Sequence, residues 1–585
     1  MTNIINKFTL LLCLLALTAS VFAASEAEYK KLSKAYTLNA DGSQEFRYSM
    51  ELTLFTHTAM NGTYGESFIV YNPEYQVLKI NSSYTKQKDG NIVKTPDNAF
   101  VEVLPRAAAD APAYNNLKEM VVVHTGLELG ATIYLDYTLT SKPGYLPELD
   151  IYDELLQSSP VKEYTISLSA PESKPLFYTL QNKNNSTKPA VSTANGMKTV
   201  TWNLRNLPAS SRDPFVSAAN GDVPFLTAST YASNGDALKA LYAQFTPASD
   251  VQLTAIAENI TESKKNDTEK VQAILKHVNE NLGYSKLSLP DAGYKIRSSS
   301  DVIYSAYGTE AEKANLLNGL LNAAGIKAEA AAIYRVKADP ASCGLNAVSG
   351  LVVVANADGK QYVMSPASNK MAVWNGITPV ISLTNAGTPV AVNTPSGDID
   401  YKVTLSVSPE KADAQVSATI GNAYLPYYGS YLSTFAGGDK EATEAKTQNG
   451  TTISYKVSQN LETNNGYVMV SLPDAPVSLA HSYYCQMNSS RKDNLLLPCK
   501  ADERYTYTVQ LPEGMKLSTP EAVKTIENAA GKVVISVKQN GNTAEVERSL
   551  QLNNQLYTPA QFTNLRSLLT EWGNTSNRTL LLSIN

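Results

Sequence analysis

The central helix of this chain is predicted to begin in the stretch Tyr307-Gly308-Thr309-Glu310-Ala311-Glu312-Lys313-Ala314-Asn315-Leu316-Leu317. Thr309 and Glu312 are spaced as a capping box, in which the hydroxyl accepts a backbone N–H and the carboxylate reaches back to the cap. Glu310 falls in the first turn, where the helix dipole favours a negative charge by about 0.3 to 1 kcal/mol at an exposed position. The leucines that follow supply an apolar face, and Gly325 is expected to end the helix.

A second helix and three short strands accompany this segment. Apolar residues recur at helical spacing over residues 271–282, and Asn266 with Glu269 can cap the start of that helix. The strand-like apolar runs downstream are 328–336, 351–354 and 361–364, the last two joined by a turn at Asp358-Gly359. Helices followed by antiparallel strands predict an α+β domain, which we place at residues 235–390.

Alternating strands flank the α+β domain on both sides. Over residues 24–234 apolar and polar residues alternate with the strand period, and Asp89-Gly90 marks a tight hairpin. The run 120–123 is expected to turn through a glycine-containing loop and return as a partner strand at 133–137. The strand period resumes over residues 391–585. We therefore predict a multidomain, mainly β chain: an N-terminal β-sandwich, the central α+β domain and a C-terminal β-rich domain.

The order of segments around the two helices resembles a known superfamily. Tyr284 follows the first helix, then comes Gly293-Tyr294-Lys295-Ile296-Arg297-Ser298-Ser299-Ser300-Asp301-Val302-Ile303, and the second helix ends in Ala323-Ala324-Gly325-Ile326. This order is similar to the transglutaminase-like superfamily, whose core is papain-like. More narrowly, the chain resembles exported bacterial proteins in which a β-rich domain of unknown function precedes that core and another β-rich module follows. Weaker matches in the first domain are Asp89-Gly90 and His124-Thr125-Gly126-Leu127-Glu128-Leu129-Gly130.

The resemblance implies that the nucleophile is absent. Active members of the superfamily use a cysteine at the start of the buried helix, activated by the helix N-terminus and by a histidine that an acidic residue orients. The usual frame resembles Gly-Asp-Cys-x-Asp-Lys-Ala. Gly308, Lys313 and Ala314 match that frame in this chain. Thr309 and Glu310 stand where the aspartate and the cysteine would be.

The other two catalytic positions are also changed. The family's aspartate lies in a phrase resembling Tyr-x-x-Asp-Pro, which here reads Tyr362-Val363-Met364-Ser365-Pro366, so Ser365 replaces the acid. Counting back across the hairpin puts Gly350 at the histidine position, and a rival register puts Ala347 there. Residues 278–480 contain no histidine, so neither register supplies one. We therefore predict no catalytic residue at these family positions.

Two enzymatic alternatives remain open. Glu310 can act as a general base only with a partner acid, metal or polarising group, and the sequence identifies none. Cys343 can be a displaced nucleophile of a thiol-dependent peptidase or acyltransferase, but it needs a base. The four histidines lie far from it in the sequence: His57, His124, His277 and His481. We expect His124 to be structural and His277 to be solvated on the exposed flank of its helix. No metal or cofactor is predicted, because no Cys/His cluster or phosphate loop occurs.

The N-terminus predicts an export signal. Lys7 precedes an apolar run over residues 8–17, and small residues end at Ala23, where cleavage is expected. Cys13 lies inside the apolar run, which disfavours a lipoprotein anchor. No later segment has the roughly 18 uninterrupted apolar residues of a membrane-spanning helix. We expect an exported protein, periplasmic or at the cell surface, and a net charge of -5 makes nucleic acid an improbable partner.

Cysteine and tyrosine usage suggests further features. Cys485 and Cys499 flank a short polar excursion, and an oxidising compartment favours a disulfide between them, worth about 3 kcal/mol. Tyrosine is frequent, with 34 residues against 12 Phe, and it clusters at Tyr424, Tyr427, Tyr428 and Tyr431 and again at Tyr483-Tyr484. Such residues anchor protein or glycan ligands, or simply suit half-exposed strands. The sequence thus predicts a non-catalytic, exported binding or scaffold module for protein or glycan ligands.

Overall fold

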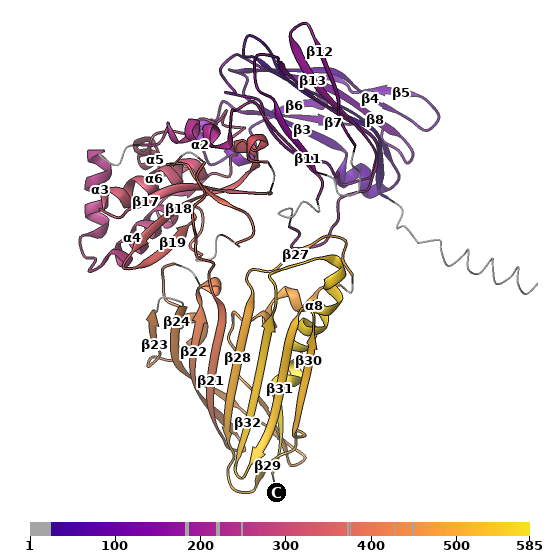
Figure 1. Ribbon diagram of the computed structural model, residues 1–585. Helices are drawn as coiled ribbons and strands as arrows, with labels where there is room; N and C mark the ends of the chain where they lie inside the picture. The colour runs from indigo at the N-terminus through magenta and orange to yellow at the C-terminus, as the bar shows by residue number, and fades with distance from the viewer. Residues whose placement is uncertain are drawn as a thin grey trace, which may run out of the picture. The chain divides into compact units, whose positions relative to one another are not determined.

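The computed structural model divides the chain into two compact units (Figure 1). The first contains the residues up to Leu149 together with Glu154–Pro175 and Asn184–Ser210; the second contains Asp150–Asp153, Leu176–Lys183 and Ser211–Asn585. The structure describes residues 25–181, 187–217, 223–246, 250–337, 339–370, 374, 376–385, 387–425, 427–446, 450–488 and 490–584. The expected export signal, residues 1–23, lies outside the described residues.

One large sheet dominates the first unit. Its strands and those of a smaller sheet are β1 (Ala27–Leu38), β2 (Gln44–Leu54), β3 (Glu66–Tyr71), β4 (Gln76–Lys86), β5 (Ile92–Lys94), β6 (Phe100–Val103), β7 (Lys118–Val123), β8 (Thr132–Ser141), β10 (Val161–Pro171), β12 (Ala190–Ala194) and β13 (Met197–Leu207). The large sheet has the order β12-β13-β10-β1-β2-β8-β4-β5, and the small one β3-β7-β6. Alternation explains these strands: in β13, Val200, Trp202 and Leu204 are buried while their neighbours are more exposed.

One of the two expected hairpins forms. The hairpin at Asp89-Gly90 is confirmed, since β4 pairs antiparallel with β5 and Gly90 has a φ of 93°. The other is wrong: β7 pairs with β3 and β6, whereas β8 pairs with β2 and β4 in the large sheet. Apolar alternation identifies both strands but carries no information about their partners. The glycine-containing connection leads from one sheet to the other.

Helices and a four-stranded antiparallel sheet form the middle of the second unit, as the predicted α+β domain requires (Figure 1). The elements are α2 (Asn234–Tyr242), α3 (Val251–Thr261), α4 (Asp267–Glu280), α5 (Ser299–Ser305), α6 (Glu310–Ala323), β17 (Ala328–Tyr334), β18 (Val348–Ala357), β19 (Lys360–Met364) and β20 (Val380–Ser382). The predicted cap of α4 is confirmed, because Asn266 Oδ1 accepts the N–H of Glu269 at 2.8 Å. Almost every residue of α6 is buried, because α3, α4, β17 and β18 surround it.

Two segments from the region assigned to the N-terminal domain belong to the second unit. They carry β9 (Asp150–Glu154) and β11 (Phe177–Gln181), which join β14 (Phe225–Ser229) in a sheet of order β11-β14-β9. The Asp150 carboxylate accepts the N–H groups of Leu345 at 2.6 Å and Asn346 at 3.2 Å. Burial raises the pKa of Asp150 to about 7, although these two N–H groups act in the opposite direction. The start of β9 is thereby attached to the loop before β18.

A large sheet with the helices α7 (Leu432–Ala436) and α8 (Pro559–Trp572) against it forms much of the C-terminal part of the second unit (Figure 1). The sheet has the order β23-β24-β22-β21-β28-β32-β31-β30, and α8 packs on β31 and β30. The strands are β21 (Gly397–Val407), β22 (Lys411–Gly421), β23 (Thr443–Lys446), β24 (Gly450–Asn460), β28 (Ala501–Gln510), β30 (Ala522–Asn528), β31 (Gly531–Asn540) and β32 (Thr543–Leu552). Tyr505 and Trp572, both buried, pack with ring centroids 5.6 Å apart. In the part of the chain that the structure describes, no helix has the length and apolar character needed to cross a bilayer.

A buried ion cluster lies in this C-terminal core. Asp474 Oδ2 lies 3.3 Å from Arg548 Nη1, 3.4 Å from Arg578 Nη1 and 3.7 Å from His481 Nε2. The Arg548 side chain is 0% exposed, and its guanidinium lies 4.6 Å from the ring centroid of Trp572. One carboxylate therefore compensates two arginines in the low-dielectric interior.

The predicted disulfide between Cys485 and Cys499 is wrong, because both residues are free thiols. Cys485 packs against the end of α8, where a Cβ added to Gly573 would lie 2.9 Å from the Cys485 Cβ, and its Sγ donates to the carbonyl oxygen of Leu479 at 3.1 Å. Cys499 faces Gly397 instead, whose added Cβ would lie 2.8 Å from the Cys499 Sγ. Each thiol is held against a different glycine, and the spacing of the two cysteines in the sequence does not reveal this.

The tyrosine cluster at residues 424–431 is not an exposed patch. Tyr427, Tyr428 and Tyr431 are all buried in the apolar cores of the second unit. Tyr483 is 61% exposed, but its neighbour Tyr484 is half-buried and packs on the Phe215 ring at 4.2 Å between centroids. These aromatic residues therefore contribute to packing and not to a ligand platform.

Candidate functional site

The start of α6 has the predicted cap. Thr309 Oγ1 accepts the N–H of Glu312 at 3.4 Å, and the Glu312 carboxylate accepts the N–H of Thr309 at 2.9 Å. Just before the helix, β15 (Gly283–Tyr284) pairs in parallel with β16 (Tyr307–Gly308). The capping box is confirmed, and this short pairing fixes the direction in which the chain enters α6.

Glu312 also forms a buried ion pair with Arg297. The guanidinium donates from Nε and Nη2 to the two carboxylate oxygens, at 3.0 Å each, and the Arg297 backbone N–H adds a third hydrogen bond at 3.0 Å. The Glu312 side chain is 0% exposed. The guanidinium lies 4.3 Å from the ring centroid of Tyr307 and donates to the Tyr307 carbonyl at 2.8 Å. This bidentate pair attaches the preceding loop to the helix start.

Glu310 and Gly350, which the resemblance assigns to the cysteine and histidine positions, lie next to each other. A Cβ added to Gly350, in β18, would lie 3.5 Å from Glu310 Oε1. Any side chain at position 350 would therefore meet the Glu310 carboxyl group. Ala347, the rival histidine position, is fully buried in a short turn before β18.

Ser365, the third family position, serves a turn. It follows the last residue of β19, and its Oγ accepts the N–H of Ala367 at 3.1 Å. Its carbonyl oxygen accepts from Asn279 Nδ2 at 3.3 Å. Ser365 does not line the cavity beside Glu310. The structure thus brings together two of the three positions and leaves the third outside.

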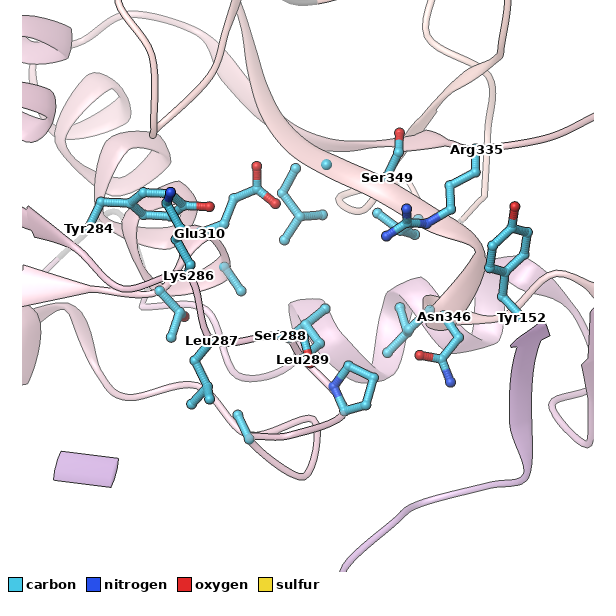
Figure 2. Close-up of a pocket in the computed structure, with 18 residues that line it drawn as sticks. Tyr152, Tyr284, Lys286, Leu287, Ser288, Leu289, Glu310, Arg335, Asn346 and Ser349 are labelled. Atoms are coloured by element: carbon cyan, nitrogen blue, oxygen red, sulfur yellow. The ribbon is translucent and has the colours of Figure 1, made fainter. Parts of the chain in front are cut away.

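A pocket of about 350 Å³ opens beside Glu310 and Gly350 (Figure 2). Its walls come from β9, the segment after β15, the start of α6, and the chain around the start of β18. Figure 2 shows Tyr284, Lys286 and Glu310 at one end of the pocket. The labelled side chains at the other end are Arg335, Asn346, Ser349 and Tyr152. The cleft expected at these positions is therefore open.

The charges of the pocket are unbalanced. Its charged side chains are Lys286, Glu310 and Arg335. Burial raises the pKa of Glu310 to about 7, while a hydrogen bond from the Leu351 N–H and the charge of Arg335 act in the opposite direction. Neither Lys286 nor Arg335 forms an ion pair with another described residue. The pocket therefore carries a net positive charge, and this charge is larger when Glu310 is protonated.

The raised pKa of Glu310 predicts a pH-dependent contribution to stability. The folded protein holds this proton up to about pH 7, whereas the unfolded chain releases it near the ordinary value of 4.5. The wild type therefore loses stability relative to Glu310→Gln as the pH rises through this window. Urea unfolding of both proteins across the window measures the difference. Asp150 and Glu503 also have pKa values raised to about 7. They contribute equally to the pH dependence of the wild type and of Glu310→Gln, so their contribution cancels in the difference between the two proteins. A difference that does not change with pH would contradict the prediction.

Cys343 lies outside the pocket. Its side chain is buried, and burial raises the pKa of the thiol to about 11, although hydrogen bonds with Ser342 and Thr227 oppose this rise. A thiol attacks as its thiolate, so Cys343 is both covered and protonated at neutral pH. It is also absent from the pocket lining. The displaced-nucleophile alternative has no support in this geometry.

The histidines do not contribute to the pocket lining either. His124 is buried in the first unit, where its Nε2 lies 2.9 Å from Ser67 Oγ and burial lowers its pKa to about 4. His277 Nδ1 lies 3.0 Å from Asn281 Nδ2 on the same helix. His124 therefore has structural surroundings, whereas His277, expected to be solvated, is half-buried, and burial lowers its pKa. Within the described ranges, no group of three His, Cys, Asp or Glu side chains is arranged to hold a metal ion.

Most of the pocket could not be identified in the sequence. Tyr152 lies in a region assigned to the N-terminal β domain, and only the fold brings β9 to the helix start. Lys286 sits in a loop without a motif. Arg335 offered a weak signal, because it is a charged residue directly after the apolar strand β17. These residues become a site only through tertiary structure.

Comparison with known families identifies three regions. Residues 40–211 match a domain of unknown function, DUF3857; residues 254–373 match the transglutaminase-like superfamily; residues 467–582 match a second domain of unknown function, DUF3858. A search of curated proteins finds no match.

Among solved structures, the chain is similar to a protein from Parabacteroides distasonis described as a candidate protease. The identity is 44%, the match covers 96% of this chain and 99% of that one, and the TM-score is 0.78. A candidate cysteine protease from Cytophaga hutchinsonii is 15% identical over 41% of this chain and 78% of its own, with a TM-score of 0.19. A similarity at that TM-score carries no structural argument.

Proposed function

The chain belongs to the transglutaminase-like superfamily, and from this premise we propose that it is a non-catalytic member that binds a ligand in the pocket beside Glu310. The observation that carries the proposal is the placement of Glu310 against Gly350 in an open pocket. Thiol catalysis needs a nucleophile and a base within hydrogen-bond reach. A glutamate in place of the cysteine supplies no thiol and a glycine in place of the histidine supplies no imidazole base, while the cavity that would receive a ligand is present.

The proposal also covers the cellular location of the protein. The expected export signal places it in the periplasm or at the cell surface, where its ligands would be proteins or glycans of the cell envelope. The relative from Parabacteroides distasonis is described as a candidate protease. For this chain we instead favour binding, since Cys343 is the cysteine nearest in sequence to the expected histidine strand and its thiol is buried and protonated.

Assays of the purified chain test this proposal. We expect no amide hydrolysis and no acyl transfer above background, and we expect the same background for Glu310→Gln and Cys343→Ala. An iodoacetamide probe at neutral pH should label Cys343 slowly in the folded chain and rapidly in urea, because burial protects the thiol. Activity that either substitution abolishes would overturn the proposal, and so would rapid labelling of folded Cys343.

A further inference from the structure

The composition of the pocket indicates the chemistry of its ligand. Resting on the proposed function, we propose that the pocket binds the free carboxyl terminus of a peptide, with the terminal carboxylate at Arg335 and the last side chain against the apolar wall. Pockets of about 300–1,000 Å³ bury small ligands, so a cavity of about 350 Å³ suits the end of a chain and not a folded surface.

Two cations of the pocket carry the first step of the argument. Arg335 and Lys286 line the pocket from opposite ends, and neither forms an ion pair with another described residue. A guanidinium is planar and binds a carboxylate through two parallel hydrogen bonds. The Arg335 guanidinium lies 5.5 Å from the ring centroid of Tyr152, which limits its orientations. An anionic group is thus the complement of this end of the pocket.

The remaining lining distinguishes a peptide from an acidic sugar. Apolar side chains form much of the wall, among them Leu287, Pro290 and Val348. Sugars bind well on free aromatic faces, but both tyrosine rings of the pocket have a cation near them: Arg335 at Tyr152, and Lys313 Nζ at 5.8 Å from the Tyr284 centroid. An apolar wall beside an unpaired guanidinium is suited to an apolar C-terminal residue with its carboxylate.

Glu310 makes the binding depend on pH. The charged or titratable groups that face its carboxyl group are Tyr284, Lys286 and Arg335. A ligand carboxylate in the same pocket repels ionised Glu310 and therefore favours its neutral form, which can donate a hydrogen bond. When Glu310 is ionised in the free protein, ligand binding is therefore accompanied by protonation of its carboxylate. The affinity should fall as the pH rises through about 7, the pKa of Glu310 in the free pocket.

Isothermal titration calorimetry of the mature chain tests the inference with the peptide acetyl-Gly-Leu-Leu. We expect the free acid to bind at least about tenfold more tightly than its C-terminal amide, which corresponds to a difference of about 1.4 kcal/mol in binding free energy. Arg335→Gln should abolish that preference, because the carboxylate loses its partner. Arg205→Gln is the matched control, since this exposed arginine lies in the first unit and forms no ion pair with a described residue. Unchanged thermal unfolding confirms that both variants fold.

The pH dependence of peptide affinity is tested with Glu310→Gln, whose side-chain amide resembles the neutral carboxyl group. Affinity of the wild type for the free acid should rise several-fold from about pH 8 to about pH 6, while the variant should bind equally at both. Equal binding of acid and amide, or no binding of either at about 1 mM, would overturn the inference. Binding of glucuronate alone, lost in Arg335→Gln, would overturn it in favour of a glycan. These binding experiments do not measure hydrolysis. The proposal that the protein is non-catalytic is tested separately by the activity assays.

Discussion

Replacement of Glu312 by alanine is expected to lower the free energy of unfolding by about 3–5 kcal/mol. Glu312 is completely buried and accepts hydrogen bonds from the Arg297 guanidinium and from the backbone N–H groups of Arg297 and Thr309. Alanine leaves the guanidinium, which is only 17% exposed, without its counter-ion and removes the carboxylate half of the capping box of α6. Urea unfolding of the mature chain, followed by far-ultraviolet circular dichroism, measures the loss.

A surface pair on a neighbouring helix provides the control. Lys276 and Glu280 are half-exposed, 3.8 Å apart and spaced i,i+4 on α4, so Glu280→Ala should cost no more than about 0.5 kcal/mol. Arg297→Met with Glu312→Leu removes both charges, and we expect this double variant to be more stable than Glu312→Ala alone. If Glu312→Ala costs as little as Glu280→Ala, the ion pair is not the support of the helix start that we infer.

The second large effect is expected at Asp474. Asp474→Ala removes the carboxylate that lies within 3.4 Å of both Arg548 and Arg578, and Arg548 cannot reach solvent. We expect a loss of about 3–5 kcal/mol, because two guanidinium groups then repel each other in the interior. Trp572, which lies 4.6 Å from the Arg548 guanidinium, gives a fluorescence signal for unfolding of this part of the chain.

The control for Asp474 is an exposed pair in the sheet that carries Arg548. Lys532 and Glu527 lie 2.9 Å apart with 44% and 64% of their side chains exposed, so Lys532→Ala should change stability by at most about 1 kcal/mol. Arg578→Gln should partly rescue Asp474→Ala, since one uncompensated charge is removed. A stability of Asp474→Ala within about 1 kcal/mol of the wild type would show that solvent compensates the two arginines.

The local features of the site were largely predictable from the sequence. Thr309 and Glu312 are three positions apart in the sequence, so their capping box forms as soon as the first helical turn does. The cap of α4 by Asn266 is equally local and was predicted in the same way. Such inferences succeed because the turn and strand periods fix the positions of residues that are close in the sequence.

Features that depend on distant contacts were not predictable. The partner of β7 is β3 and not β8, and the thiols of Cys485 and Cys499 are held against different glycines. In each case the local sequence pattern identified the strand or the cysteine, but its neighbour is determined by tertiary packing. The raised pKa of Glu310 has the same origin, because the pocket walls that partly bury this first-turn glutamate come from distant segments of the chain.

The path of the chain between the two units has an evolutionary consequence. The chain changes unit after Leu149, Asp153, Pro175, Lys183 and Ser210, so neither unit is encoded by one uninterrupted stretch of its gene. A single recombination event that transferred the transglutaminase-like core would leave behind the codon for Tyr152 and with it one wall of the pocket. A transfer that keeps the pocket must therefore begin before the codon for Tyr152, and it then carries part of the first unit with it.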